Sequence, residues 1–174
     1  GFGTGGYCIP LSSQYVLKEV KDKSKLTLLR ETIKTDTNIN ILIAKSLIQK
    51  GYKKIGVLGL SYKGNLKVDI LSPVIPFIKY LKSKNVSVNL FDPYYSIKEI
   101  KQITGVNSFK YPEDLSKFDC IVISIDHKEF KINMKKIGNH LKNCKYILDN
   151  MRVWEKIKFP KSITYKISGE KNWL

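Results

Sequence analysis

From residue 51 onward, short apolar stretches alternate with segments in which apolar residues recur every three or four positions. The short stretches are typical of buried strands, and the longer periodic segments are typical of amphipathic helices. This alternation indicates βαβ units and a mostly parallel sheet. Strands are predicted over 54–58, 86–90, 119–125, 146–148 and 163–167, and helices over 73–81, 97–104 and 134–141.

The first 50 residues follow a different pattern. Ser12 or Ser13 can cap a short helix that continues through Val20, and a long helix is predicted over 25–49. We therefore expect an α/β fold in which a long helical segment, 1–50, precedes a Rossmann-like domain with flanking helices over 51–174. The long helix is either one more helix of the domain or, because lysines flank its apolar face, a helix that bridges domains or a dimer.

Composition narrows the function classes. The 174 residues suffice for one domain and a modest appendage, and no apolar stretch is long enough to span a membrane. The net charge of +16 suggests nucleic-acid binding as a function. However, the lysines are spread over every segment, and Arg30 and Arg152 are the only arginines. We do not expect specific nucleic-acid binding, because a positive charge attracts an anionic small-molecule substrate equally well. We expect the protein to be cytoplasmic.

The three cysteines are far apart, which predicts neither a disulfide framework nor a metal site. Cys120 and Cys144 belong to apolar surroundings and are predicted core residues. Cys8 lies in a glycine-rich loop shortly before a predicted helix, whose positive end favours a thiolate. Cys8 is thus either a nucleophile or a structural cysteine in a tight turn.

Two glycine-rich segments could contact a ligand. Residues 1–6 contain G-x-G-x-x-G, but no strand stands before them and Tyr7 to Pro10 interrupt a direct run into a helix, so we do not assign a dinucleotide fingerprint. The second segment, 55–64, runs from a strand into a loop before a helix, which is the context for phosphate binding. There Lys63 could contact a phosphate, and Tyr62 could stack or donate a hydrogen bond.

Five short motifs in this order carry a family resemblance: Gly-Thr-Gly-Gly-Tyr-Cys-Ile-Pro at 3–10, Gly-Val-Leu-Gly-Leu-Ser-Tyr-Lys at 56–63, Ser72-Pro73, Phe-Asp-Pro-Tyr at 91–94 and Ile-Asp-His at 125–127. The chain resembles the UDP-glucose/GDP-mannose dehydrogenase family, over its central helices and C-terminal nucleotide-binding domain. The Gly-Gly-x-Cys-Ile-Pro form is most similar to the branch acting on UDP-N-acetylmannosamine or UDP-N-acetylglucosamine.

The resemblance implies an NAD-dependent oxidation of the C6 hydroxyl of a UDP-sugar to a carboxylate. Cys8 matches the nucleophile that forms a thiohemiacetal and then a thioester. Gly5 and Gly6 match the loop that meets the sugar, Tyr62 and Lys63 match an aromatic-lysine pair on the nucleotide sugar, and Arg152 matches a substrate contact. The resemblance also implies a homodimer, and an N-terminal NAD-binding domain that is absent from this chain.

Several positions depart from the family pattern. Ser12 and Ile70 stand where the family has an aspartate and an arginine, and Asn150 replaces an aspartate two residues before Arg152. Ser12 and Ile70 favour an alternative, a non-catalytic nucleotide-sugar-binding or regulatory module with the same fold. Asp92 and His127 follow predicted strands, yet a turn aspartate and a hydrogen-bonded histidine explain them as well, and we do not assign them to the site.

Overall fold

The computed structural model describes residues 1–131 and 137–173. Its centre is a six-stranded sheet in the order β3-β2-β1-β4-β5-β6, in which every neighbouring pair is parallel. The predicted Rossmann-like α/β fold is therefore confirmed. Only β3, a polar two-residue strand, was not predicted. The strands are β1 Lys54–Leu58, β2 Ser87–Phe91, β3 Asn107–Ser108, β4 Cys120–Ile123, β5 Tyr146–Asp149 and β6 Thr164–Ile167.

Helices and short 3-10 turns connect these strands. Part of the predicted helix over 134–141 lies outside the described residues, since 132–136 are not described, and its described remainder includes η4. The α-helices are α1 Cys8–Glu19, α2 Thr27–Gln49, α3 Val74–Ser83 and α4 Ile97–Thr104, and the 3-10 helices are η1 Lys23–Leu26, η2 Glu113–Lys117, η3 Lys128–Lys131 and η4 Gly138–His140.

Alternating strand residues form two cores, one on each face of the sheet. On one face Ile55 and Val122 join apolar residues of α2, α3 and α4. On the other face Ile121 and Ile147 pack against Trp154 and the aromatic residues around η2 and η3. Both faces of the parallel sheet are therefore covered by other elements. This explains why the sequences of its central strands are continuously apolar.

Local capping signals fix the ends of α4. The Ser96 side chain accepts a hydrogen bond from the Glu99 backbone N–H, and the Glu99 carboxylate accepts from the Ser96 backbone N–H, which completes a capping box. Gly105 ends the helix in the left-handed region with φ of 69°. The predicted bounds 97–104 are confirmed.

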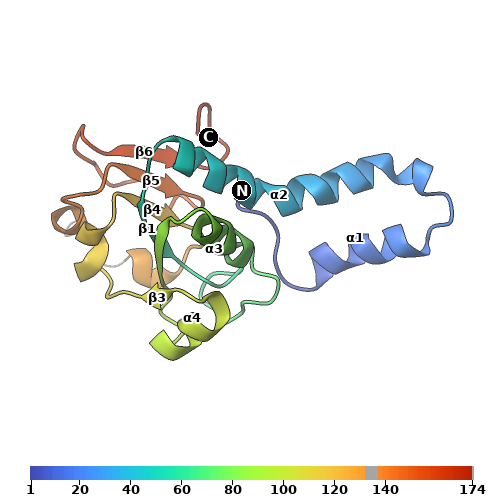
Figure 1. The fold of residues 1–174 in the computed structure, drawn as a ribbon, viewed down its shortest axis with the longest axis horizontal. Helices are drawn as coiled ribbons and strands as arrows, with labels where there is room; N and C mark the ends of the chain where they lie inside the picture. Colours follow the sequence, from blue (N-terminus) through green and yellow to red (C-terminus); the bar gives the residue numbers. More distant parts are fainter. Residues whose placement is uncertain (132–136, 174) are drawn as a thin grey trace.

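The helices α1 and α2 lie side by side and extend away from the sheet as an arm (Figure 1). Only the C-terminal half of α2, with Ile43 and Leu47, is buried against the domain, and α1 has no buried residue. No helix in the described part of the chain is long and apolar enough to cross a membrane. The division into 1–50 and 51–174 remains a prediction.

The start of α1 differs from the prediction. Ser12 and Ser13 do not cap the helix but lie inside it, and the Ser13 hydroxyl donates to the Ile9 and Pro10 carbonyls. The helix begins earlier, at Cys8. Pro10 does not prevent this, because N–H groups in the first turn have no partner within the helix and the N–H that proline lacks is not needed there. Cys8 is consequently the first residue of α1 rather than part of the loop before it.

Candidate functional site

The segment before α1 is anchored between α2 and α3. Phe2 is buried and its ring packs edge-on against Phe77 of α3 at a centroid distance of 5.0 Å. The Thr4 backbone N–H and hydroxyl donate to the Asp36 carboxylate of α2 at 3.0 and 2.7 Å. Because both ends of this short stretch are held, the following glycines have a defined position.

Gly5 and Gly6 pack directly on Tyr62 of the loop after β1. The Gly6 N–H donates to the Ile70 carbonyl at 2.8 Å. A Cβ added to Gly5 would lie 2.8 Å from the Tyr62 Cγ and closer still to its Cβ, and one added to Gly6 would lie 2.8 Å from the ring Cζ. Gly6 also has a positive φ of 81°. Only glycine fits both positions, because the backbone itself forms the contact with the ring.

This contact brings the two predicted ligand-binding loops together. Cys8 follows Gly6 by two residues and is exposed at the first turn of α1, where backbone N–H groups have no partner within the helix. Lys63 follows Tyr62 and is exposed. The expectation that no helix runs out of the third glycine of 1–6 is wrong, since α1 begins at Cys8. Four of the predicted site residues, Gly5, Gly6, Cys8 and Tyr62, thus belong to one junction that Lys63 adjoins.

The glycine turn after β1 is closed against the end of β4. Gly59 has φ of 102°, and a Cβ added there would lie 2.8 Å from the Ser124 Oγ and closer to the Ile125 side chain. The Ser124 hydroxyl is within hydrogen-bond distance of the Leu58 and Gly59 carbonyls, at 2.9 and 2.8 Å. The two strands that flank the switch point of the sheet are therefore joined by direct contact at their carboxyl ends.

Asp92 occupies the anion position of this turn with its own carboxylate. Its side chain is fully buried, and Oδ2 accepts the backbone N–H groups of Leu60 and Ser61 at 2.7 and 3.1 Å. Oδ1 accepts the Tyr94 N–H at 2.9 Å. Burial by itself would raise the pKa of Asp92, but hydrogen bonds from His127, Leu60 and Tyr94 outweigh burial, and the pKa is lowered.

The phosphate interpretation of this second glycine segment therefore needs correction. A phosphate at such a turn is held by backbone N–H groups and by the start of the following helix. Here Asp92 already takes the Leu60 and Ser61 N–H groups, and α3 begins only at Val74, after a long loop. Lys63 is exposed in that loop, so a phosphate can reach its ammonium group but not the Leu60 and Ser61 N–H groups.

Arg152 lies apart from this junction, after β5. It has φ of 57°, and its guanidinium donates to the Glu155 and Glu170 carboxylates, the latter at 2.9 Å. The Glu155 hydrogen bond and the nearby Glu170 charge raise the pKa of Arg152 above its ordinary value. The structure does not bring Arg152 into contact with the Gly5–Tyr62 junction.

A hollow of about 450 Å³ lies between α1, α2 and the segment before α3. Sequence reasoning missed Asn40, which lines it and is 2% exposed, and whose Oδ1 has no hydrogen-bond partner among the described residues. An asparagine on the same face of α2 as Ile43, Ala44 and Leu47 is the signal that could have found it. Among residues 1–131 and 137–173, no cluster of His, Cys, Asp and Glu could hold a metal ion.

The strand order, with β1 central and the crossover to β4, places the domain in the Rossmann-like class of α/β folds. Within that class, residues 56–156 match the family model described as UDP-glucose/GDP-mannose dehydrogenase family, UDP binding domain, and the chain belongs to this family. The resemblance stated from the sequence motifs is confirmed.

Relatives and solved structures agree with this assignment. The UDP-N-acetyl-D-mannosamine dehydrogenase of Methanococcus aeolicus is 28% identical, covering 100% of this chain and 40% of that protein. The UDP-glucose 6-dehydrogenase of Rickettsia prowazekii is 32% identical over 91% of this chain and 40% of its own length. The UDP-D-ManNAc dehydrogenase structure from Pyrococcus horikoshii superposes with a TM-score of 0.73 and 26% identity, covering 96% of this chain and 39% of that one. The chain thus spans about 40% of these relatives.

Proposed function

We propose that this chain is the substrate-binding part of an NAD-dependent nucleotide-sugar 6-dehydrogenase, and that it supplies Cys8 as the nucleophile. The observation that carries the proposal is the packing of Gly5 and Gly6 on Tyr62, which brings the glycine segment before Cys8 against the loop that carries Lys63. The substrate class is a UDP-sugar: UDP-N-acetylmannosamine, UDP-glucose or UDP-N-acetylglucosamine. The relatives named above act on such sugars by their names.

Cys8 is proposed to hold the substrate covalently during oxidation at C6. Its thiolate adds to the C6 aldehyde carbon to give a thiohemiacetal, the carbonyl oxygen taking up a proton. Oxidation of that adduct to a thioester removes a hydride and a proton, and NAD⁺ bound elsewhere in the protein would supply the hydride acceptor. Water then attacks the thioester carbonyl carbon, the carbon-sulfur bond breaks, and the carboxylate and the thiol are released. The position of Cys8 at the first turn of an α-helix supports this role, because the helix N-terminus favours a negatively charged sulfur.

The described residues do not fit NAD at the sheet edge. A ribose at the end of β2 would need a free carboxylate, whereas Asp92 is fully buried and bonded to three backbone N–H groups and to His127. We therefore derive no step through NAD here, and propose that its site lies on a part of the protein outside these 174 residues.

The UDP moiety is proposed to bind beside Tyr62 and Lys63, the ammonium of Lys63 contacting a phosphate. Arg152 is proposed as a further substrate contact, which requires its guanidinium to leave Glu155 or Glu170. A charge-assisted hydrogen bond contributes about 1.5–3 kcal/mol, which is roughly 10-fold to 150-fold in affinity.

Calorimetric titration of the 174-residue chain with UDP tests this placement. Lys63→Met should weaken binding by roughly 10-fold or more. The matched control is Lys98→Met, which removes another exposed lysine, from α4, and should leave the affinity unchanged. Equal affinities for the two variants, or no binding by the unmodified chain, would refute the proposed nucleotide site.

The second candidate is a binding or regulatory module without catalysis. It is favoured by the exposed Ser12 and Ile70, which stand where the family has an aspartate and an arginine. In the full-length protein that carries this chain, NADH production with UDP-sugars that disappears in Cys8→Ser supports the enzyme. UDP binding without any NADH production supports the module.

We also propose that the protein is a homodimer formed through the α1–α2 arm. Helix α1 has no buried residue, and the arm exposes Ile9, Tyr15, Val16, Leu28 and Leu42. Apolar side chains at this density on an extended helix pair are typical of a protein interface. Light scattering that gives the mass of one chain at micromolar concentration would contradict this proposal.

A further inference from the structure

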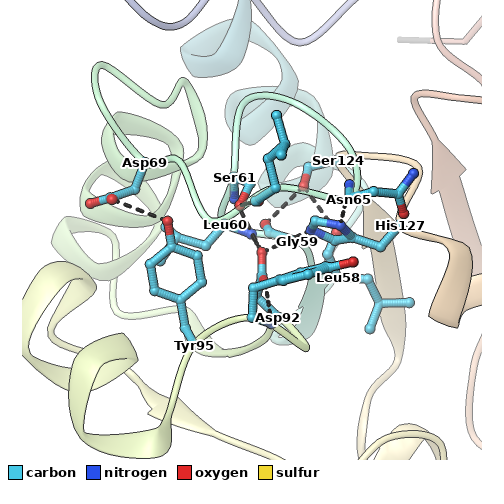
Figure 2. Close-up of polar contacts among 12 residues, drawn as sticks. Leu58, Gly59, Leu60, Ser61, Asn65, Asp69, Asp92, Tyr95, Ser124 and His127 are labelled. Atoms are coloured by element: carbon cyan, nitrogen blue, oxygen red, sulfur yellow. Dashed lines mark hydrogen bonds and ion pairs between the residues drawn. The ribbon is translucent and has the colours of Figure 1, made fainter.

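His127 fixes the loop between β1 and α3 through a cluster of hydrogen-bonded residues that takes no part in the proposed reaction. The imidazole is fully buried, its Nε2 lies 3.1 Å from the Asp92 Oδ2, and its Nδ1 accepts the Asn65 backbone N–H at 2.9 Å (Figure 2). We call Asp92, His127 and Asn65 the loop clasp. It joins the ends of β2 and β4 to the loop that carries Tyr62 and Lys63.

The two hydrogen bonds define the protonation state of the ring. The Asn65 backbone nitrogen can only donate, so Nδ1 must present its lone pair. The Asp92 carboxylate can only accept, so Nε2 carries the proton. His127 is therefore neutral in this structure, as the Nε2–H tautomer. A second proton on Nδ1 would face the Asn65 N–H, and this hydrogen bond would have to break.

Asn65 is a point at which the whole loop is fixed. It adopts φ of 60°, and its side-chain Oδ1 accepts the Lys128 backbone N–H at 2.8 Å. The neighbouring Gly64 packs on Asp126, whose carbonyl oxygen would lie 3.1 Å from an added Cβ. Because Asn65 is held on one side of Tyr62 and Lys63, and Ile70 holds Gly6 on the other, these two residues lie between two anchors.

Titratable groups from several elements surround the ring. Asp92 faces it from the end of β2, and the Tyr94 ring lies 4.9 Å away, with its hydroxyl 3.4 Å from a Glu129 carboxylate oxygen of η3. The Phe130 ring covers the imidazole at 5.3 Å. Asp126, the residue before His127, pairs with Lys131 at 3.5 Å. The imidazole is therefore enclosed by Asp92, Tyr94 and Phe130.

We propose that neutral His127 is a positioning residue for the nucleotide-sugar site: its Nδ1 lone pair fixes the 59–73 loop through Asn65, and loss of this acceptor releases the loop and with it Tyr62 and Lys63. The effect on UDP affinity rests on the function proposed above, whereas the effect on the loop does not.

Amide hydrogen exchange of Asn65, followed by NMR in the 174-residue chain, tests the loop directly. In the unmodified chain, the hydrogen bond to the His127 Nδ1 should protect the Asn65 amide. Protection of Val122 in the central strand β4 serves as the internal control. The ¹⁵N shifts of His127 should show a protonated Nε2 and an unprotonated Nδ1.

Two variants separate the clasp from general stability. In His127→Asn the side-chain oxygen can replace Nδ1 as the acceptor for Asn65, whereas in His127→Gln the amide can replace Nε2 as the donor to Asp92. The asparagine variant should keep Asn65 protected. In the glutamine variant, protection of Asn65 corrected for intrinsic exchange should fall by roughly fivefold or more, the effect of losing one hydrogen bond, and the UDP affinity should fall roughly fivefold.

The outcomes distinguish this inference from the proposed function. A protonated Nδ1 in the unmodified chain, or equal protection of Asn65 in the two variants, would overturn the positioning role. If the loop responds as described but the unmodified chain binds no UDP, the positioning of the loop stands and the proposed nucleotide site fails. If UDP binds with the same affinity when Asn65 is unprotected, the loop does not control the site, and the link to it is refuted.

Discussion

Gly5→Ala is the substitution that strains the junction most directly. An alanine Cβ at this position would lie 2.8 Å from the Tyr62 Cγ and closer to the Tyr62 Cβ, whereas carbon atoms pack at about 3.5–4.0 Å. The contacted atoms are at the base of the tyrosine side chain and cannot swing away. The two loops would therefore have to separate by about 1 Å.

The expected cost follows from this overlap. Inserting a methyl group into a packed contact raises the free energy of that contact by about 1–3 kcal/mol. Bringing the two loops together to form the site would require this additional free energy. UDP affinity should therefore fall between about fivefold and 150-fold. Gly1→Ala is the matched control, since a Cβ added there meets nothing within 4 Å and should change neither stability nor binding.

Urea denaturation and calorimetric UDP titration of the same samples give the two quantities. The reasoning predicts that both the free energy of unfolding and the affinity fall for Gly5→Ala. Unchanged values for both would show that the loops are not in contact as described. A loss of stability with full UDP affinity would show that the junction is structural and does not build the nucleotide site.

Three further predictions concern other residues. Brief iodoacetamide treatment should alkylate the exposed Cys8 and spare the buried Cys120 and Cys144. Burial raises the pKa of Cys120 well above its ordinary value and that of Cys144 to about 12, so neither thiol is reactive at neutral pH. Mass mapping that finds Cys120 labelled first would contradict this prediction. Asp92→Ala should destabilise the chain by about 3 kcal/mol, measured in urea, because it leaves buried N–H groups unpaired. Since folding lowers the pKa of Asp92, its contribution is present above the unfolded value of about 4 and is lost as the pH falls through the folded value, so wild type and Asp92→Ala should converge in acid. Trp154→Phe should cost about 1–3 kcal/mol, since it removes the buried hydrogen bond from Nε1 to the Phe130 carbonyl, and equal melting temperatures would refute this.

Local sequence signals predicted most of the fold. Gly105 by itself indicates the end of α4, and the apolar runs of β1 and β4 need no partner to be recognised. The strand β3 was missed because Asn107 and Ser108 carry no apolar pattern, and the pairing comes from β2. The start of α1 was missed because a proline in the first turn is compatible with the helix but does not require it.

The candidate site was predictable only in part. Cys8, Tyr62 and Lys63 were found from motifs, but their meeting depends on a contact between Gly5 and Tyr62, more than fifty positions apart in the sequence. The same holds for Asp92 and His127, which follow different strands and meet because those strands flank β1 in one parallel sheet. Periodicity reports local structure, and it contains no information on which distant loops share an edge.

We propose above that Gly5 and Gly6, just before Cys8, and the loop after β1 that carries Tyr62 and Lys63 form one nucleotide-sugar site. Backbone NMR shifts of the 174-residue chain during titration with a UDP-sugar measure this most directly. We predict saturable shifts with one common dissociation constant at Gly5, Gly6, Tyr62 and Lys63. Shifts that leave these four amides unchanged, or that occur only around Arg152 after β5, would contradict the account.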